Sequence, residues 1–148
     1  MRIACLSLGL FCAALTAQAQ GPVITKLGTI ECDLVEATPL VFKGKLYRFE
    51  YVRDHYKPNT TGDSYFRFVD TTSGETTPSF ARGFHLGSAY AANGTMYVYG
   101  VPLWGEDAIH VFWSTNLEDW QEQVAFQKDG WGIYNTAVAE GPDGYVMA

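Results

Sequence analysis

Short runs of hydrophobic residues alternate with polar, glycine-containing turns along most of the chain. Three segments, 38–49, 88–99 and 136–147, align with one another. In each segment an apolar run leads into Lys-Gly, Asn-Gly or Asp-Gly, and an aromatic or apolar run follows. Asn-Gly and Asp-Gly tolerate the positive φ angles that a tight hairpin turn needs. The pattern therefore predicts three β-hairpins at Gly44, Gly94 and Gly144, with a period of 50 residues.

A second pair of strands is expected after each of the first two hairpins. Residues 65–69 lead into the polar turn 70–76, and residues 110–113 lead into the turn 114–120. Four antiparallel strands per repeat of this length are typical of one blade of a β-propeller. The sequence thus predicts an all-β propeller, with blade one at about 32–81, blade two at about 82–128 and a partial third blade at 129–148.

The number of predicted blades has a structural consequence. Propellers close with at least four blades, whereas about two and a half fit into this sequence. We therefore expect the sequence to be the N-terminal part of a longer propeller, and the functional expectations below concern that whole protein. The isolated chain would carry an unpaired sheet edge, which favours association.

The N-terminus has the pattern of a secretory signal peptide. Arg2 is followed by an apolar run over 3–15 and by small residues before a cleavage site after Ala19. The apolar run is too short to span a bilayer as a helix. We expect residues 1–19 to be removed, 20–31 to lead into the propeller, and the protein to be secreted or periplasmic. The alternative is a buried N-terminal helix.

Composition narrows the possible partners. The formal net charge is −6 and no basic cluster is present, which argues against nucleic acid as a partner. After removal of the signal peptide Cys32 is the remaining cysteine, so an internal disulfide is excluded and a buried thiol is expected. No His and acid spacing suggests a metal, and no Gly-x-Ser-x-Gly elbow is present. We expect neither a metal nor a cofactor.

Residues that begin the first strand of each blade are the candidates for ligand contact, because that strand lines the central channel. They are Asp33, Glu36, Thr38, His85, Ser88, Tyr134, Asn135 and Thr136. Glu36 opens an otherwise apolar strand, and a carboxylate with little water around it can act as a general base. The structural alternative is a carboxylate that caps backbone amides or pairs with Arg53 or Arg82.

Other candidates also have two interpretations. His85 could donate a hydrogen bond to a ligand hydroxyl, or it could be a fully bonded histidine between blades. Arg53 lies in the connection 51–58, which is rich in charged and aromatic groups, and Trp104 lies in a second aromatic connection. Aromatic faces stack on sugar rings and polar groups bind hydroxyls, so this mixture suits a carbohydrate. Packing between blades is the alternative for the aromatic residues.

Two stretches resemble the five-bladed glycoside hydrolases of family 43 and their relatives in the arabinanase, levansucrase and invertase superfamily. Residues 114–120, Ser-Thr-Asn-Leu-Glu-Asp-Trp, resemble the Ser-x-Asp-Leu-x-x-Trp turn of that group, and residues 36–47 resemble its first-blade strand. The resemblance implies five blades and hydrolysis of a glycosidic bond by two carboxyl groups. It places Glu36 where the family has a catalytic Asp, with Asp33 as the alternative.

The sequence departs from the family pattern in ways that keep a second function open. The first catalytic position is Glu rather than Asp, and Asn135 stands where an Asp would be expected. Glu140-Gly141-Pro142 imitates the family's acid motif but is expected in a hairpin turn, so the general acid is expected beyond Ala148. The preferred hypothesis is a secreted glycoside hydrolase acting on a plant or algal poly- or oligosaccharide. The alternative is a non-catalytic propeller that binds glycan or protein.

The preferred hypothesis assigns the sugar contacts to a small set of side chains, with the carbohydrate as the expected partner. These are His85, Tyr134, Asn135, Arg53 and Trp104.

Overall fold

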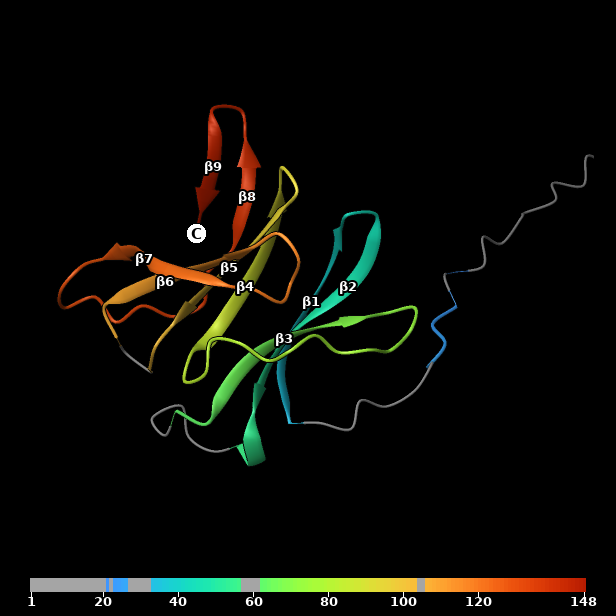
Figure 1. Cartoon of the computed structure of the whole chain (residues 1–148). Coiled ribbons are helices and arrows are strands. Elements are labelled where there is room, and N and C mark those ends of the chain that lie inside the picture. The colour runs from blue at the N-terminus through green and yellow to red at the C-terminus, as the bar shows by residue number, and fades with distance from the viewer. Residues whose placement is uncertain (1–20, 22, 27–32, 57–61, 104–105) are drawn as a thin grey trace, which may run out of the picture.

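The described strands form three separate antiparallel sheets, and the described residues contain one short 3-10 turn and no longer helix (Figure 1). The structure is a computed structural model that describes residues 21, 23–26, 33–56, 62–103 and 106–148. The predicted signal peptide 1–19, Cys32 and Trp104 lie outside these residues, as does most of the predicted lead-in. Within the described residues, no helix has the length and apolar character needed to cross a membrane.

The sheets follow one another along the chain, and each is built from consecutive strands. The first sheet has the order β1-β2-β3, the second β4-β5-β6-β7 and the third β8-β9. The strands of the first sheet are β1 (Leu34–Phe42), β2 (Lys45–Arg53) and β3 (Ser64–Asp70), with the 3-10 turn η1 (Asp54–Tyr56) after β2. The others are β4 (His85–Ala92), β5 (Thr95–Val101), β6 (Ala108–Ser114), β7 (Gln121–Gln127), β8 (Val138–Gly141) and β9 (Gly144–Met147).

The first two predicted hairpins have the expected turn. Lys43 and Gly44 have φ angles of 48° and 78°, and Asn93 and Gly94 have φ angles of 50° and 75°. Two consecutive positive φ angles are what a two-residue turn of type I′ requires, because its twist matches that of the strands. The turn chemistry read from the sequence therefore sets the register of both hairpins.

The third hairpin is shifted by one residue from the prediction. Gly141 pairs with Gly144, so the turn consists of Pro142 and Asp143, and Gly144 begins the outgoing strand. A turn at Asp143-Gly144 would require Pro142 to pair with Tyr145. Proline has no N–H to contribute to a strand ladder, so the turn forms one residue earlier.

The fourth strand of the first sheet is irregular, whereas β7 completes the second sheet. Segment 76–80 contacts β3 through two isolated bridges, Val69 with Thr76 and Phe66 with Phe80. Pro78 lies between the bridges and cannot donate to the ladder. The Thr77 hydroxyl oxygen instead accepts a hydrogen bond from the backbone N–H of Phe68 at 3.0 Å. The predicted four-stranded repeat is thus regular in the second sheet and interrupted in the first.

The first strands of the three sheets lie next to one another in chain order, since β4 contacts β1 on one side and β8 on the other. In Figure 1 the sheets fan out from this inner row, with the red β8-β9 hairpin beside the yellow-green β4. The main hydrophobic core fills the space between the first and second sheets. Its largest fully buried apolar side chains are Tyr51, Phe49, Phe66, Phe68 and Met96.

The turn 114–120 ties the second sheet to the first. Ser114 Oγ accepts hydrogen bonds from the N–H groups of Asn116 and Leu117 at 3.2 and 2.9 Å. Asn116 Oδ1 accepts in turn from the next two N–H groups along the chain. The turn delivers Trp120 onto Phe80, with ring centroids 3.8 Å apart and planes 5° apart. A local motif read from the sequence therefore acts in the packing between sheets.

Candidate functional site

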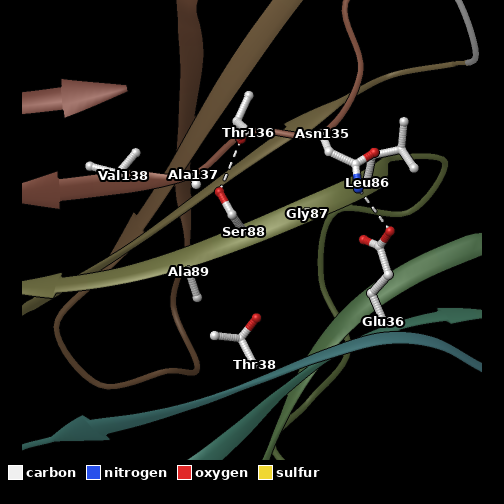
Figure 2. Close-up of a pocket in the computed structure, with 10 residues that line it drawn as sticks. All are labelled: Glu36, Thr38, Leu86, Gly87, Ser88, Ala89, Asn135, Thr136, Ala137 and Val138. Atoms are coloured by element: carbon white, nitrogen blue, oxygen red, sulfur yellow. Dashed lines mark hydrogen bonds between the residues drawn. The ribbon is translucent and has the colours of Figure 1, made fainter. Parts of the chain in front are cut away.

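Three corresponding positions of the repeat meet at the start of the inner strands. Glu36 on β1, Leu86 on β4 and Asn135 just before β8 occupy equivalent positions. Each stands six residues before the residue that ends the first strand of its hairpin. All three line one pocket (Figure 2). Because the repeats place the same position on the same side of each sheet, residues 99 positions apart in the chain become neighbours.

The pocket has a volume of about 310 Å³ and is formed by the first strands of all three sheets. Its walls combine hydroxyl groups, one amide and one carboxylate with small apolar side chains. The lining residues are Glu36, Thr38, Leu86, Gly87, Ser88, Ala89, Asn135, Thr136, Ala137 and Val138. Glu36, Thr38, Ser88, Asn135 and Thr136 are thus brought together as the sequence predicted.

Two hydrogen bonds connect the strands across the pocket. Asn135 Nδ2 donates to Glu36 Oε1 at 3.0 Å, which links the segment just before β8 to β1. The hydroxyls of Ser88 and Thr136 lie 3.0 Å apart and link β4 to the same segment before β8. Figure 2 shows the Glu36 carboxylate rising from β1 toward the Asn135 amide. Among the described lining residues Glu36 is the single ionisable group, so it sets the charge of the pocket.

Irregular pairing shapes the backbone beneath these side chains. The register of β1 with β2 shifts between Leu34 and Glu36, and that of β4 with β5 shifts between His85 and Ser88. Extra residues of this kind bend a strand and change the direction of its side chains. Leu86 has a φ of 53°, which is unusual for a leucine. The two irregularities fall where each inner strand enters the pocket.

Gly87 permits the close approach of the sheets at this point. A Cβ at Gly87 would lie 2.7 Å from the Phe66 ring and 2.9 Å from the Phe49 ring. Any side chain would therefore push β4 away from the aromatic core of the first sheet. The pocket wall and the core share this residue, which is not among the candidates predicted from the sequence. Leu86 could have been found by counting back from Gly94, as Glu36 stands eight residues before Gly44.

His85 is buried and does not line the pocket. Its side chain has no exposed surface. The ring Nδ1 lies 2.8 Å from the Tyr51 hydroxyl, and Nε2 lies 3.5 Å from Ser64 Oγ. Ser64 Oγ donates to the carbonyl oxygen of Phe84 at 2.6 Å, so it can accept from Nε2–H while Nδ1 accepts from the phenol. The structure favours a bonded histidine between sheets over a direct contact with a sugar.

Burial keeps this pair neutral. Burial lowers the pKa of His85 below its usual 6.5, and the positive charge of Arg53 lowers it further. Burial raises the pKa of Tyr51 to about 12; the Arg53 charge opposes this and the Glu36 charge adds to it. Both groups are therefore uncharged at neutral pH, which suits a support for the site rather than proton transfer.

Asp33, Arg53 and Tyr134 are the remaining described candidates, and they lie outside the lining of this pocket. The Asp33 carboxylate accepts a hydrogen bond from the N–H of His55, and its backbone oxygen accepts from the N–H of Arg53. Asp33 therefore anchors the turn after β2. The Tyr134 side chain is 44% exposed and precedes Asn135 directly. Within the described residues no group of three or more His, Cys, Asp and Glu is arranged to hold a metal ion.

Comparison with known proteins identifies the fold. No protein-family model matches the chain, and no curated protein matches it in sequence. A solved structure that does match in three dimensions is the calcium-free crystal structure of a family 43 β-xylosidase/α-arabinofuranosidase from a compost microbial metagenome, in complex with xylotriose. The TM-score is 0.52 at 17% identity, over 79% of this chain and 42% of that one. This chain therefore spans less than half the length of the similar protein.

The match confirms the predicted architecture. The three sheets of this chain follow part of the β-propeller of a family 43 glycoside hydrolase. The expected resemblance to this group is confirmed at the level of the fold. Identity this low carries no residue roles, so the chemistry of the pocket has to be argued from its own side chains.

Proposed function

We propose that the whole protein is a glycoside hydrolase acting on a plant or algal poly- or oligosaccharide, with Glu36 as a catalytic carboxylate. The observation that supports this most directly is the position of Glu36: one carboxylate, among neutral hydrogen-bonding groups, in a pocket where three inner strands meet. Neutral hydroxyls and amides beside one charged group suit the hydroxyl groups of a sugar. The propeller fold is shared with an enzyme of this class.

The contacts of Glu36 suit a general base. Asn135 holds Oε1 through its amide, which fixes the plane of the carboxylate and leaves Oε2 to accept a proton from water. Glycosidases use a second carboxyl group as general acid. The described lining residues contribute one carboxylate, so we assign the acid to a part of the whole protein outside this pocket lining.

A non-catalytic glycan-binding propeller is the second candidate, and a specific observation favours it. The positions that correspond to Glu36 in the next two repeats hold Leu86 and Asn135, neither of which is acidic. Glu36 already accepts a hydrogen bond from the Asn135 amide. A pocket of this kind could bind sugar hydroxyls without cleaving a bond.

Glu36→Gln in the whole protein separates the two candidates, because glutamine keeps the shape of the side chain and removes the charge. If Glu36 is a general base, kcat on arabinose-, xylose- or galactose-containing oligosaccharides falls by about 10²-fold or more while binding is largely retained. Glu140→Gln is the matched control, since Glu140 lies on β8 outside the pocket lining. Unchanged turnover in Glu36→Gln would contradict the assignment, whereas binding without turnover in the parent protein would establish the second candidate.

We also propose that the protein is exported after removal of residues 1–19. The support is the charged start, the short apolar run and the small residues before Gln20. Mass spectrometry of the secreted or periplasmic protein should give an N-terminus at or near Gln20. An intact form beginning at Met1 in the cytoplasm would contradict export.

A further inference from the structure

A second polar pocket lies on the first sheet, apart from the residues around Glu36. It has a volume of about 300 Å³ and opens on the face of β3 that is turned away from the aromatic core. It combines two guanidinium groups, one carboxylate and several hydroxyls. The lining residues are Asp54, Tyr65, Arg67, Thr76, Thr77, Ser79 and Arg82. None of these lines the Glu36 pocket.

The inner wall of this pocket is held by a buried carboxylate that binds two arginines. The Glu50 side chain has no exposed surface, and its two oxygens bind Arg48 Nη2 and Arg67 Nε at 2.6 Å each. Arg67 is therefore fixed in place by Glu50, with its side chain 22% exposed. The guanidinium is a rigid part of the pocket wall.

Arg82 supplies the second positive charge and is exposed at the rim. Its guanidinium carbon lies 5.4 Å from the centre of the Tyr65 ring. Within the described part of the chain Arg82 has this ring as its contact and no acidic partner. A planar guanidinium with unused N–H groups binds carboxylate or sulfate oxygens in a bidentate manner. The pocket thus brings two arginines together on a chain whose formal net charge is −6.

Asp54 decides between a simple anion and a larger ligand. Its carboxylate lines the same pocket and repels an inorganic anion, but it accepts hydrogen bonds from hydroxyl groups. Thr76 and Ser79 offer further hydroxyls, and both residues are exposed. The set of groups therefore matches a ligand that carries an oxyanion on one side and hydroxyl donors on the other.

We propose that this pocket binds an acidic sugar residue, with its carboxylate or sulfate ester on Arg82 and Arg67 and its hydroxyls on Asp54 and the neighbouring hydroxyl side chains. The shared chemistry of uronate and sulfated sugars is an anionic group on a ring rich in hydroxyls. The site is independent of Glu36, so it stands or falls separately from the proposed hydrolysis.

Titration calorimetry of the protein with four probes tests the proposal: glucuronate, glucose 6-sulfate, glucose and inorganic sulfate. We expect at least one of the two acidic sugars to bind about tenfold or more tightly than glucose and than inorganic sulfate. The stronger of the two identifies the anionic group. Equal binding of acidic sugars and glucose would overturn the proposal, and inorganic sulfate binding as tightly as the acidic sugars would overturn the sugar part of it.

Two variants place the binding in this pocket. Arg82→Gln removes the charge at an exposed position and should weaken acidic-sugar binding by about tenfold, while Lys26→Gln, an exposed cation elsewhere, should leave it unchanged. Asp54→Ala should weaken the acidic sugar but strengthen inorganic sulfate, because repulsion is removed together with a hydroxyl acceptor. If Arg82→Gln has no effect, or if Asp54→Ala shifts both ligands in the same direction, the assignment is wrong. Circular dichroism confirms that each variant is folded.

Discussion

The contact between the first and second sheets differs from the contact between the second sheet and the β8-β9 hairpin. Phe49 on the first sheet and Tyr99 on the second stand at the same place in the repeat, five residues after their hairpin glycine. Phe49 is completely buried. Tyr99 is half-buried and lines an open groove with Tyr97 and Trp113 on the same face.

The difference shows what closes a propeller face. Over Phe49 and its neighbours lie the strands of a four-stranded sheet, and Trp120 at the end of the turn before β7 stacks on Phe80. Over the second sheet lies a two-stranded hairpin, whose Tyr145 contacts Tyr90 with ring centroids 5.4 Å apart. The inner strands alone therefore cover the inner half of a face, and burial of the outer half depends on outer strands.

Replacing the two equivalent aromatic residues should give the largest difference between the faces. We expect Phe49→Ala to lower the free energy of unfolding by about 3–5 kcal/mol, because it removes a fully buried ring from a filled core. Tyr99→Ala should cost clearly less, since part of its ring already contacts solvent. Chemical unfolding followed by fluorescence measures both. Equal losses would mean that the two faces are equally packed in solution.

A smaller effect is expected from adding one methyl group at the close approach between sheets. Gly87→Ala places a Cβ 2.7 Å from the Phe66 ring, and overpacking of this kind costs about 1–3 kcal/mol. The matched substitution in the open region is Gly141→Ala, where the nearest atoms are 3.4 Å away. Thermal unfolding of both variants should rank Gly87→Ala as the more damaging. The reverse order would contradict the tight contact seen at β4.

The stability of the contact between the first and second sheets should also depend on pH through His85. Burial holds the pKa of His85 below 6.5 in the folded protein, so below pH 6.5 the unfolded chain binds a proton that the folded chain does not. Stability should therefore fall as the pH drops below about 6.5 and level off above it. His85→Gln should flatten this dependence, measured as unfolding midpoints between pH 5 and 8. A slope that survives the substitution would assign the effect to other groups.

The smallest effect on stability is expected at the contact between the second sheet and the segment just before β8. Ser88→Ala removes the hydroxyl that lies 3.0 Å from Thr136 Oγ1, and such hydrogen bonds contribute about 0.5–1.5 kcal/mol. A double-mutant cycle with Thr136→Val isolates the pair. A coupling energy near zero would show that this link between the sheets does not hold in solution.

Local sequence signals located most of the strands and turns. Lys43-Gly44 and Asn93-Gly94 fix their hairpins because their positive φ angles suit the required turn. The third turn lies one residue earlier than the turn predicted at Gly144, because Pro142 prevents the expected pairing. The sequence pattern likewise predicts a regular fourth strand in the first sheet, where Pro78 interrupts the ladder. Both corrections come from the missing N–H of proline, a signal that was present in the sequence.

The candidate site was predictable in part. The start of the inner strand in each repeat predicts Glu36, Ser88 and Asn135 as site residues, and all three line one pocket. The same rule predicts His85, but its side chain is buried and bonded to the Tyr51 hydroxyl. The pairing register of β4 shifts between His85 and Ser88, and the sequence pattern alone does not locate an irregularity that depends on how the strands pair.

The sequence by itself determined the first two hairpin turns, the turn around Ser114 and the repeat of antiparallel strands, because turn chemistry and strand alternation act over a few residues. The tertiary structure decided which side chains meet. The hydrogen bond between Asn135 and Glu36 joins residues 99 positions apart, and the burial of Phe49 depends on a sheet that follows it in the chain. Such contacts form where sheets pack. Burial of apolar surface is favourable in proportion to the area covered and has no preferred direction, so the local sequence does not specify which faces meet.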